Sequence, residues 1–381
     1  MKTVPVIAYF AGDSSRTYQL IQWLEVLDGL NEVHPVCIVL RDPASAPVIG
    51  SRTKLPVFTA ETLPELTELY AALDARVVLY CNNSAQNFES LLDGRRLHVH
   101  INHGESDKQS MASNNAKAYD RVFVAGEAAV QRYVTGLMEF DESRLVRIGR
   151  PQLDLSRTPL VAPSSRRTIL YAPTWEGDAD YNDYTSVDTM GETIVRAILD
   201  VPDVRLVYKP HPKITTSRTP DVAAAHLNIL GVIAEAARRD PGAGHVPVLG
   251  GDILAVMPAC DAMVTDVSSV GLDWLYLHTD RPIFLTDRHS DVESLRERIP
   301  ISRCADVLTR DDVDGLTTLL GQRLDRDEHH FARMAMRHHY FDDLHVGDST
   351  ARFLGSVSEL VALCEELLGD LARPDGAAHT G

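Results

Sequence analysis

Cysteine is scarce in this sequence and follows no pattern. The 381 residues contain 5 cysteines, and no two of them form a Cys-x-x-Cys pair: Cys37, Cys81, Cys260, Cys304 and Cys364. An odd, scattered set argues against a disulfide framework and against a structural zinc site. We therefore expect a protein of a reducing compartment that holds no structural metal.

Long hydrophobic runs are also missing. No apolar stretch approaches the ~20 residues that a membrane-spanning helix needs. The chain begins with a predicted strand, Val4–Phe10, and shows neither the charged region nor the long apolar core of a signal peptide. These absences predict a cytoplasmic protein, and peripheral contact with the inner face of the membrane stays open.

Positive charge is in deficit. Lys and Arg number 37 against 54 Asp and Glu, which gives a net charge of −17. Nucleic-acid-binding surfaces need clustered cations to displace counterions, and anionic lipid attracts the same clusters. The balance therefore argues against a nucleic-acid partner and against adsorption to lipid by charge alone. A chain of this length is long enough for two ordinary domains.

The first part of the chain alternates between short apolar strands and amphipathic helices. Strands are predicted at Val4–Phe10, Val36–Leu40, Val57–Phe58, Val77–Tyr80, Leu97–Ile101, Arg121–Val124 and Val146–Ile148. Helices are predicted at Thr17–Leu27, Leu63–Leu73 and Glu127–Thr135. Such alternation is typical of βαβ units with a parallel sheet between layers of helices.

A linker rich in Pro, Ser and Ala, Thr158–Arg167, precedes a second alternating series. Its predicted strands are Ile169–Tyr171, Val204–Tyr208, Ala262–Val264 and Pro282–Leu285, with a weaker one at Val246–Leu249. Its predicted helices are Gly191–Leu199, Val222–Arg239, Ile253–Pro258, Val270–Leu275 and Val313–Leu324. A long amphipathic helix, Thr350–Leu371, follows both series.

These patterns predict an α/β protein of two Rossmann-like domains that face each other across a cleft. The expected boundaries are residues 1–157 for the N-terminal domain and 168–349 for the C-terminal domain. Residues 350–372 form the final helix, and residues 373–381, without pattern, are expected to be a disordered tail.

Three segments of the second half share one format, a short apolar strand that ends in polar groups. They are Ile169–Trp175, Leu206–Pro212 and Ala262–Ser269. In the last, Ser268 and Ser269 open a helix, where hydroxyls and unpaired N–H groups suit an anion. Carboxyl ends of parallel strands line the ligand crevice of such sheets. The pattern therefore indicates a phosphate-bearing, nucleotide-linked substrate.

Five short motifs in a fixed order resemble those of a known family. They are His103-Gly104, Gly149-x-Pro151-x-x-Asp154, Ala172-Pro-Thr-Trp175, Lys209-Pro-His-Pro212 and Thr265-Asp-x-Ser-Ser269. In this order the chain resembles the CDP-glycerol glycerophosphotransferases, the primases and polymerases of teichoic acid, which have the GT-B fold. The resemblance covers about residues 100–350 and is tightest in the second half.

The resemblance implies a reaction and a set of roles. An acceptor hydroxyl, on a glycan or a lipid-linked polymer, attacks the β-phosphorus of CDP-glycerol or a relative such as CDP-ribitol, and CMP departs without a cofactor. Such a transfer needs positioning, charge neutralisation and removal of one proton. The implied catalytic residues are His103 as the base and His211; the implied donor-binding residues are Thr174, Trp175, Lys209, Asp266, Ser268 and Ser269; the implied acceptor side contains Gly104 and Lys108.

Each of these residues also has a structural interpretation. His103 follows an apolar strand and is also suited to hydrogen-bonding a loop carbonyl. The two serines are suited to capping a helix, Asp266 to stabilising a loop, and Trp175 to packing. The chain departs from the family after His103-Gly104, where the family commonly has Thr-Pro-Leu-Lys and this chain has Glu-Ser-Asp-Lys108, so acceptor identity stays open.

Two other functions remain compatible with the motifs. One is a GT-B glycosyltransferase that attacks the anomeric carbon of a nucleotide sugar, and the other is a binding protein that retains the fold without turnover. The motifs separate neither primase from polymerase nor one oligomeric state from another.

Overall fold

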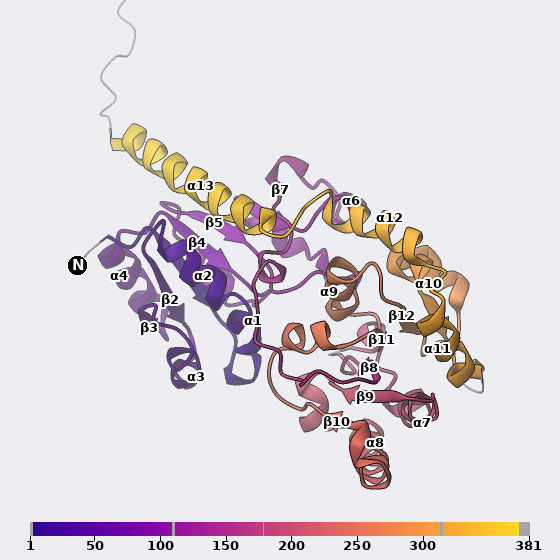
Figure 1. Cartoon of the computed structure of the whole chain (residues 1–381). Coiled ribbons are helices and arrows are strands. Elements are labelled where there is room, and N and C mark those ends of the chain that lie inside the picture. The colour runs from indigo at the N-terminus through magenta and orange to yellow at the C-terminus, as the bar shows by residue number, and fades with distance from the viewer. Residues whose placement is uncertain (1–2, 109–110, 178, 313–314, 373–381) are drawn as a thin grey trace, which may run out of the picture. The chain divides into compact units, whose positions relative to one another are not determined.

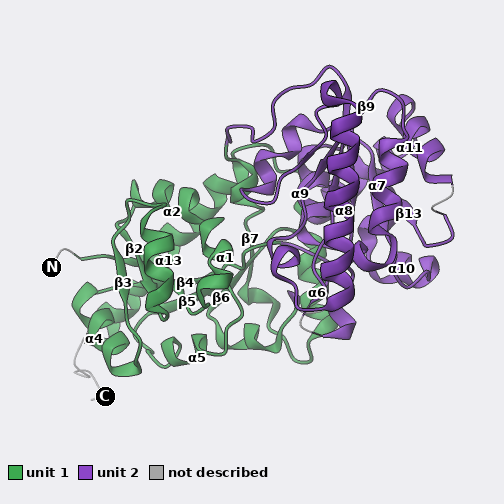
Figure 2. Ribbon diagram, turned by 90° about the horizontal axis from the view of Figure 1, so that it is seen from below, with its two compact units in different colours: residues 1–104, 112–155, 341–381 green, residues 105–111, 156–340 purple. Residues whose placement is uncertain are grey.

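The computed structural model describes residues 3–108, 111–177, 179–312 and 315–372 of the chain (Figure 1). They form two compact units (Figure 2): unit 1 comprises residues 1–104, 112–155 and 341–381, and unit 2 comprises residues 105–111 and 156–340. Both units are therefore discontinuous in sequence. The tail predicted at residues 373–381 lies outside the described residues.

Unit 1 is built on a seven-stranded sheet with the strand order β3-β2-β1-β4-β5-β6-β7. Its strands are β1 (Val6–Phe10), β2 (Val36–Leu40), β3 (Val57–Thr59), β4 (Val77–Tyr80), β5 (Leu97–His100), β6 (Arg121–Val124) and β7 (Leu145–Arg147). All six neighbouring pairs are parallel. This order, which reverses at β1, is that of a doubly wound nucleotide-binding fold, and the predicted parallel sheet is confirmed.

The apolar runs of this sheet are buried on both faces. Along β1, Val6, Ala8 and Phe10 belong to one core cluster. Ile7 and Tyr9, which alternate with them, belong to a second cluster on the opposite face. A strand covered on both sides needs an uninterrupted apolar sequence, and this need explains the run Val-Ile-Ala-Tyr-Phe.

The helices of unit 1 include one from the far end of the chain. They are α1 (Tyr18–Ile21), α2 (Leu24–Asn31), α3 (Ala46–Gly50), α4 (Leu63–Leu73), α5 (Asn87–Ser90), α6 (Glu127–Gly136) and α13 (Asp348–Ala372). Figure 1 shows α13, in yellow, beside α2 and β4. Phe353 of α13 is fully buried and its ring lies 5.3 Å from that of Trp23. The last helix therefore completes the first core.

Unit 2 has a six-stranded sheet with the strand order β10-β9-β8-β11-β12-β13. Its strands are β8 (Arg167–Ala172), β9 (Val204–Tyr208), β10 (Val246–Pro247), β11 (Ala262–Thr265), β12 (Ile283–Thr286) and β13 (Asp306–Leu308), all paired in parallel. Its helices are α7 (Glu192–Leu199), α8 (Pro220–Arg239), α9 (Ser269–Leu277), α10 (Val292–Arg298), α11 (Leu316–Asp325) and most of α12 (His330–Phe341).

Two predicted helices differ in the structure. In place of a helix at Ile253–Pro258 there are two 3₁₀ turns, Ile253–Ala255 and Met257–Ala259. Pro258 has no N–H and disfavours helical backbone before it, which explains the interruption. The helix predicted at Thr17–Leu27 is divided into α1 and α2. Trp23, at the division, donates its indole N–H to the Asn102 carbonyl at 2.5 Å.

Three elements of unit 2 escaped prediction altogether: β13, α10 and α12. Strand β13 has three residues and lies at the sheet edge, so its apolar pattern is too short to predict a strand. The helix predicted at Val313–Leu324 is observed as α11, and residues 313 and 314 lie outside the described residues.

Replacing Phe353 tests the role of α13 in unit 1. We expect Phe353→Ala to lower the free energy of unfolding by roughly 3–5 kcal/mol, because a large buried ring is lost and a cavity remains. Leu371→Ala, on the same helix but 67% exposed, is the control and is expected to change it by less than about 0.5 kcal/mol. Urea unfolding of both variants measures this, and equal stabilities would contradict the assignment.

Candidate functional site

The three motif loops of unit 2 follow neighbouring strands. Thr174 and Trp175 follow β8, Lys209 and His211 follow β9, and Asp266 follows β11. Strand β8 pairs with both β9 and β11, so all three loops leave the same edge of the sheet. The structure therefore brings together the donor-binding residues expected from the sequence, at the edge where parallel sheets bind ligands.

Asp266 ties these loops together. It is fully buried, and its Oδ2 accepts the N–H groups of Thr174 at 2.7 Å and Ser186 at 3.3 Å. Its Oδ1 accepts the Thr286 hydroxyl at 2.5 Å. Burial raises the pKa of Asp266 to about 6 against the opposing effect of these hydrogen bonds. The sequence predicts that Asp266 either binds the donor or stabilises a loop. The geometry matches the loop stabiliser, because both carboxylate oxygens accept hydrogen bonds from the protein.

Ser268 is the N-cap residue of α9 but does not cap the helix with its side chain. Its Oγ is buried and has no hydrogen-bond partner among the described residues. Ser269 is the first residue of the helix and is half-buried. The first N–H groups of a helix lack intrahelical partners and attract an anion. A buried hydroxyl beside them therefore forms a polar site that the described protein atoms leave unsatisfied.

Lys209 supplies a cation at the same sheet edge. It is 4% exposed, and its ammonium has no hydrogen bond or ion pair with the described residues. Burial lowers its pKa below the ordinary value, and the Asp252 carboxylate opposes this shift. Because a buried ammonium is costly without a partner, the position suits an anionic ligand.

Trp175 and His211 lie against each other in the neighbouring loops. Their rings stack at 6.0 Å and 28°, and the Lys213 ammonium lies 3.5 Å from the centre of the Trp175 ring. His211 Nδ1 accepts the Lys213 N–H at 3.2 Å. The indole is half-buried, so the contact combines the packing expected of Trp175 with an aromatic surface at the site.

Lys108, expected on the acceptor side of the N-terminal half, belongs to unit 2. Its ammonium lies 5.5 Å from the centre of the Tyr184 ring. Burial lowers its pKa, and the Asp266 and Asp183 carboxylates oppose the shift. The carboxylates that act on the pKa of Lys108 thus both belong to unit 2, a placement that the motif order alone does not indicate.

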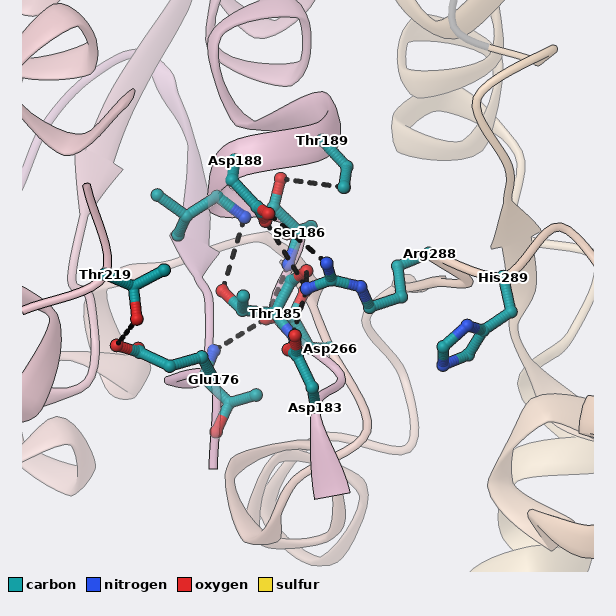
Figure 3. Close-up of polar contacts among 12 residues, drawn as sticks. Glu176, Asp183, Thr185, Ser186, Asp188, Thr189, Thr219, Asp266, Arg288 and His289 are labelled. Atoms are coloured by element: carbon teal, nitrogen blue, oxygen red, sulfur yellow. Dashed lines mark hydrogen bonds and ion pairs between the residues drawn. The ribbon is translucent and has the colours of Figure 1, made fainter. Parts of the chain in front are cut away.

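Arg288 is a further residue of this sheet edge that the sequence did not single out. It follows β12 and contacts Asp183 at 2.7 Å, Asp188 at 3.2 Å and the Thr185 carbonyl at 2.9 Å (Figure 3). The signal that identifies it is the format of the other three loops, an apolar strand followed directly by polar residues, Thr286-Asp-Arg288.

His103 and Gly104 end the first segment of unit 1, residues 1–104, and His103 lies three residues after the end of β5. Burial, and secondarily the Arg150 charge, lower the pKa of His103 to about 4. Its Nδ1 is buried without a hydrogen-bond partner among the described residues. Asn102 precedes it in the left-handed region at φ 53° and accepts the His103 N–H at 2.9 Å. The imidazole is therefore neutral at neutral pH and held by a fixed backbone.

The described residues contain no group of three or more His, Cys, Asp or Glu side chains placed to hold a metal ion. Within the same residues, no helix has both the length and the apolar character needed to cross a bilayer.

Comparison with known families adds a decisive match. The model of the family described as CDP-glycerol:poly(glycerophosphate) glycerophosphotransferase covers residues 95–294, more than half of the chain. The chain belongs to this family. The matched range includes His103 and all the motif loops of unit 2, and it extends past Arg288. The predictions of this family and of a glycerophosphotransferase-like enzyme are therefore confirmed.

Solved structures agree on the fold. A putative UDP-N-acetylglucosamine 2-epimerase from Listeria monocytogenes is similar with a TM-score of 0.61 and 16% identity over 94% of this chain and 96% of that one. The wall teichoic acid polymerase TagF gives a TM-score of 0.60 and 13% identity over 96% and 90%. The UDP-GlcNAc 2-epimerase of Neisseria meningitidis gives 0.56 and 12% over 94% and 100%. No curated protein matches the chain. The predicted GT-B fold is confirmed.

The pH dependence of stability tests the buried state of Asp266. Because the pKa is raised from 3.8 to about 6 in the folded state, the folded protein binds this proton more tightly than the unfolded chain does. The contribution of Asp266 to stability therefore declines as the pH rises from about 4 to about 6. We expect wild type to lose roughly 2–3 kcal/mol relative to Asp266→Asn over this range. Urea unfolding at both pH values measures it, and parallel curves would contradict it.

Proposed function

We propose that this enzyme transfers glycerol phosphate, or a related polyol phosphate, from a CDP-linked donor to an acceptor hydroxyl on a glycan or lipid-linked polymer, with release of CMP. One observation carries the proposal. At a single sheet edge of unit 2, the motif loops present a buried serine hydroxyl and a buried lysine ammonium that both lack partners among the described residues. A pyrophosphate supplies the oxygens that such groups require.

The donor phosphates are proposed to lie at the start of α9. There Ser268 and the helix N–H groups donate hydrogen bonds, and Lys209 contributes positive charge. His211 stabilises the charge that develops on the departing CMP. Lys108 is proposed to act here as well, because its charged neighbours Asp183 and Asp266 both belong to this unit. Asp266 acts indirectly by holding Thr174.

His103 is proposed as the general base. The acceptor oxygen forms a bond to the β-phosphorus while the bond from that phosphorus to the bridging oxygen breaks. The acceptor proton passes to the imidazole, and CMP leaves with the electron pair of the broken bond. A pKa of about 4 leaves the imidazole unprotonated at neutral pH, which is the form that a base needs, and makes it a weaker proton acceptor than a histidine of ordinary pKa. Gly104 lies on the same, acceptor-binding side.

A donor panel tests the reaction itself. Purified protein is incubated with CDP-glycerol, CDP-ribitol, CMP-linked sugars and UDP-linked sugars, each with and without a lipid-linked polyol acceptor, and released nucleotide is measured. We expect CMP release from a CDP-polyol only when the acceptor is present. Release of UDP, or of CMP from a CMP-sugar, would instead indicate a glycosyltransferase, and nucleotide binding without any turnover would indicate a binding protein.

The variant His103→Ala tests the base. We expect turnover to fall by roughly 10²–10⁴-fold while donor affinity is kept, because the proposed donor-binding residues all belong to unit 2. His34→Ala is the control, since this histidine of the same unit contacts Ser358 of α13. Turnover like that of wild type in His103→Ala would exclude the assignment.

The variants Ser268→Ala and Lys209→Gln test the phosphate site. Each is expected to weaken the binding of CDP by roughly 10- to 100-fold, because each removes a hydrogen bond to a charged group. Lys117→Gln, a lysine of unit 1 that donates to the Met138 carbonyl, is the matched control. Calorimetric titration with CDP and with cytidine measures the effect, which should be confined to CDP.

A further inference from the structure

Glu176 adds a carboxylate to the donor-site edge of unit 2 that neither the motifs nor the proposed reaction uses. It follows Trp175 in the loop after β8. Its Oε1 accepts hydrogen bonds from two hydroxyls of the loop after β9, those of Ser217 and of Thr219. The contact with Thr219, at 3.1 Å, is drawn in Figure 3. The two hydroxyls hold the carboxylate in one orientation.

The other oxygen of this carboxylate is unsatisfied. Glu176 Oε2 is buried and has no hydrogen-bond partner among the described residues. A buried polar atom without a partner costs roughly 1–3 kcal/mol, and more when the group is charged. Ser217 and Thr219 thus orient the carboxylate, and its second oxygen has no hydrogen-bond donor among the described residues. This arrangement suits the binding of a ligand that supplies such a donor.

The chemistry of Oε2 restricts what that ligand group is. A carboxylate only accepts hydrogen bonds, and it repels the phosphate oxygens proposed to bind at Ser268 and Lys209. The complementary group is a hydrogen-bond donor, and the hydroxyls of a CDP-polyol are neutral donors of this kind. Trp175, next in sequence, presents a half-buried indole that suits the uncharged part of a nucleotide.

We propose that Glu176 is a specificity-determining residue that accepts a hydrogen bond from a hydroxyl of the donor, with Ser217 and Thr219 as its positioning residues. This inference rests on the proposed function. A CDP-polyol carries such hydroxyls in two places, on the ribose and on the polyol. Either source provides the same O–H donor, and the two are separated by ligands that lack one set or the other.

The test compares the affinities of matched ligands for wild type and Glu176→Ala by calorimetric titration. The first pair is CMP and 2′,3′-dideoxy-CMP, which differ only in the ribose hydroxyls. The second pair is CDP-glycerol and the propyl ester of CDP, which differ only in the hydroxyls of the polyol. In wild type we expect the hydroxyl-bearing member of one pair to bind roughly 10- to 100-fold more tightly, and in Glu176→Ala we expect that ratio to fall to about one.

Controls separate this role from a structural one. Glu192→Ala removes a carboxylate of α7 that pairs with Arg196 on the surface, and it should keep the wild-type ratio. Ser217→Ala combined with Thr219→Val should reduce the ratio partly, because the carboxylate remains but loses its orientation. Circular dichroism and the affinity for pyrophosphate, which has no hydroxyl for Glu176 to bind, establish that Glu176→Ala is folded with an intact phosphate site.

The outcomes distinguish the two proposals. If wild type binds these ligands and neither ratio changes in Glu176→Ala, the role of Glu176 is wrong and the proposed function stands. A change in the first pair identifies the ribose as the source, and a change in the second identifies the polyol. If wild type binds no cytidine ligand at all, the proposed function fails, and the inference about Glu176 fails with it.

Discussion

The arrangement of the motif loops of unit 2 depends on one buried carboxylate. Asp266 joins the loop after β8, the turn before α7 and the end of β12 through Thr174, Ser186 and Thr286. They lie 92, 80 and 20 residues from Asp266 in sequence. An apolar contact does not fix the direction of a backbone N–H group as a hydrogen bond does. A buried acid that is satisfied in this way imposes one geometry on all three segments, because any other arrangement leaves a charged group unpaired. The positions of the other residues in these loops therefore depend on Asp266.

Within that frame, unit 2 divides its polar groups into those that are satisfied and those that are not. Arg288 is held by Asp183 and Asp188, so it contributes to the fold of the edge. Lys209 and Ser268, by contrast, have no partners among the described residues, and the apolar surroundings make their lack of partners costly. A ligand that forms hydrogen bonds or ion pairs with these two groups removes the free-energy cost of leaving them buried without partners. The contrast distinguishes the groups that shape the site from those proposed to bind there.

Unit 1 shows how the same sheet architecture tunes a histidine. His103 follows β5, where burial and the Arg150 charge both favour the neutral imidazole. In this unit the last helix, α13, supplies Phe353 and Val357 to the core beneath the sheet. A residue from the end of the chain is therefore part of the packing that supports a motif near residue 100. Such packing joins segments that local sequence patterns treat separately.

The sequence by itself determined the two parallel sheets, because a strand that is buried on both faces has a continuous apolar sequence. It also determined the family, because the order of the five motifs is visible in the sequence without the fold. It also identified Ser268, Lys209 and His103 as candidates. It failed at Ile253–Pro258, where Pro258 overrides an apolar pattern, and it left Asp266 with two interpretations. Only the tertiary structure showed that both oxygens of Asp266 are engaged, that Lys108 belongs to unit 2, and that Glu176 retains an unsatisfied oxygen. The hydrogen-bond partners, burial and charge environment of a side chain depend on segments that are distant in the chain. They are therefore defined only in the folded protein.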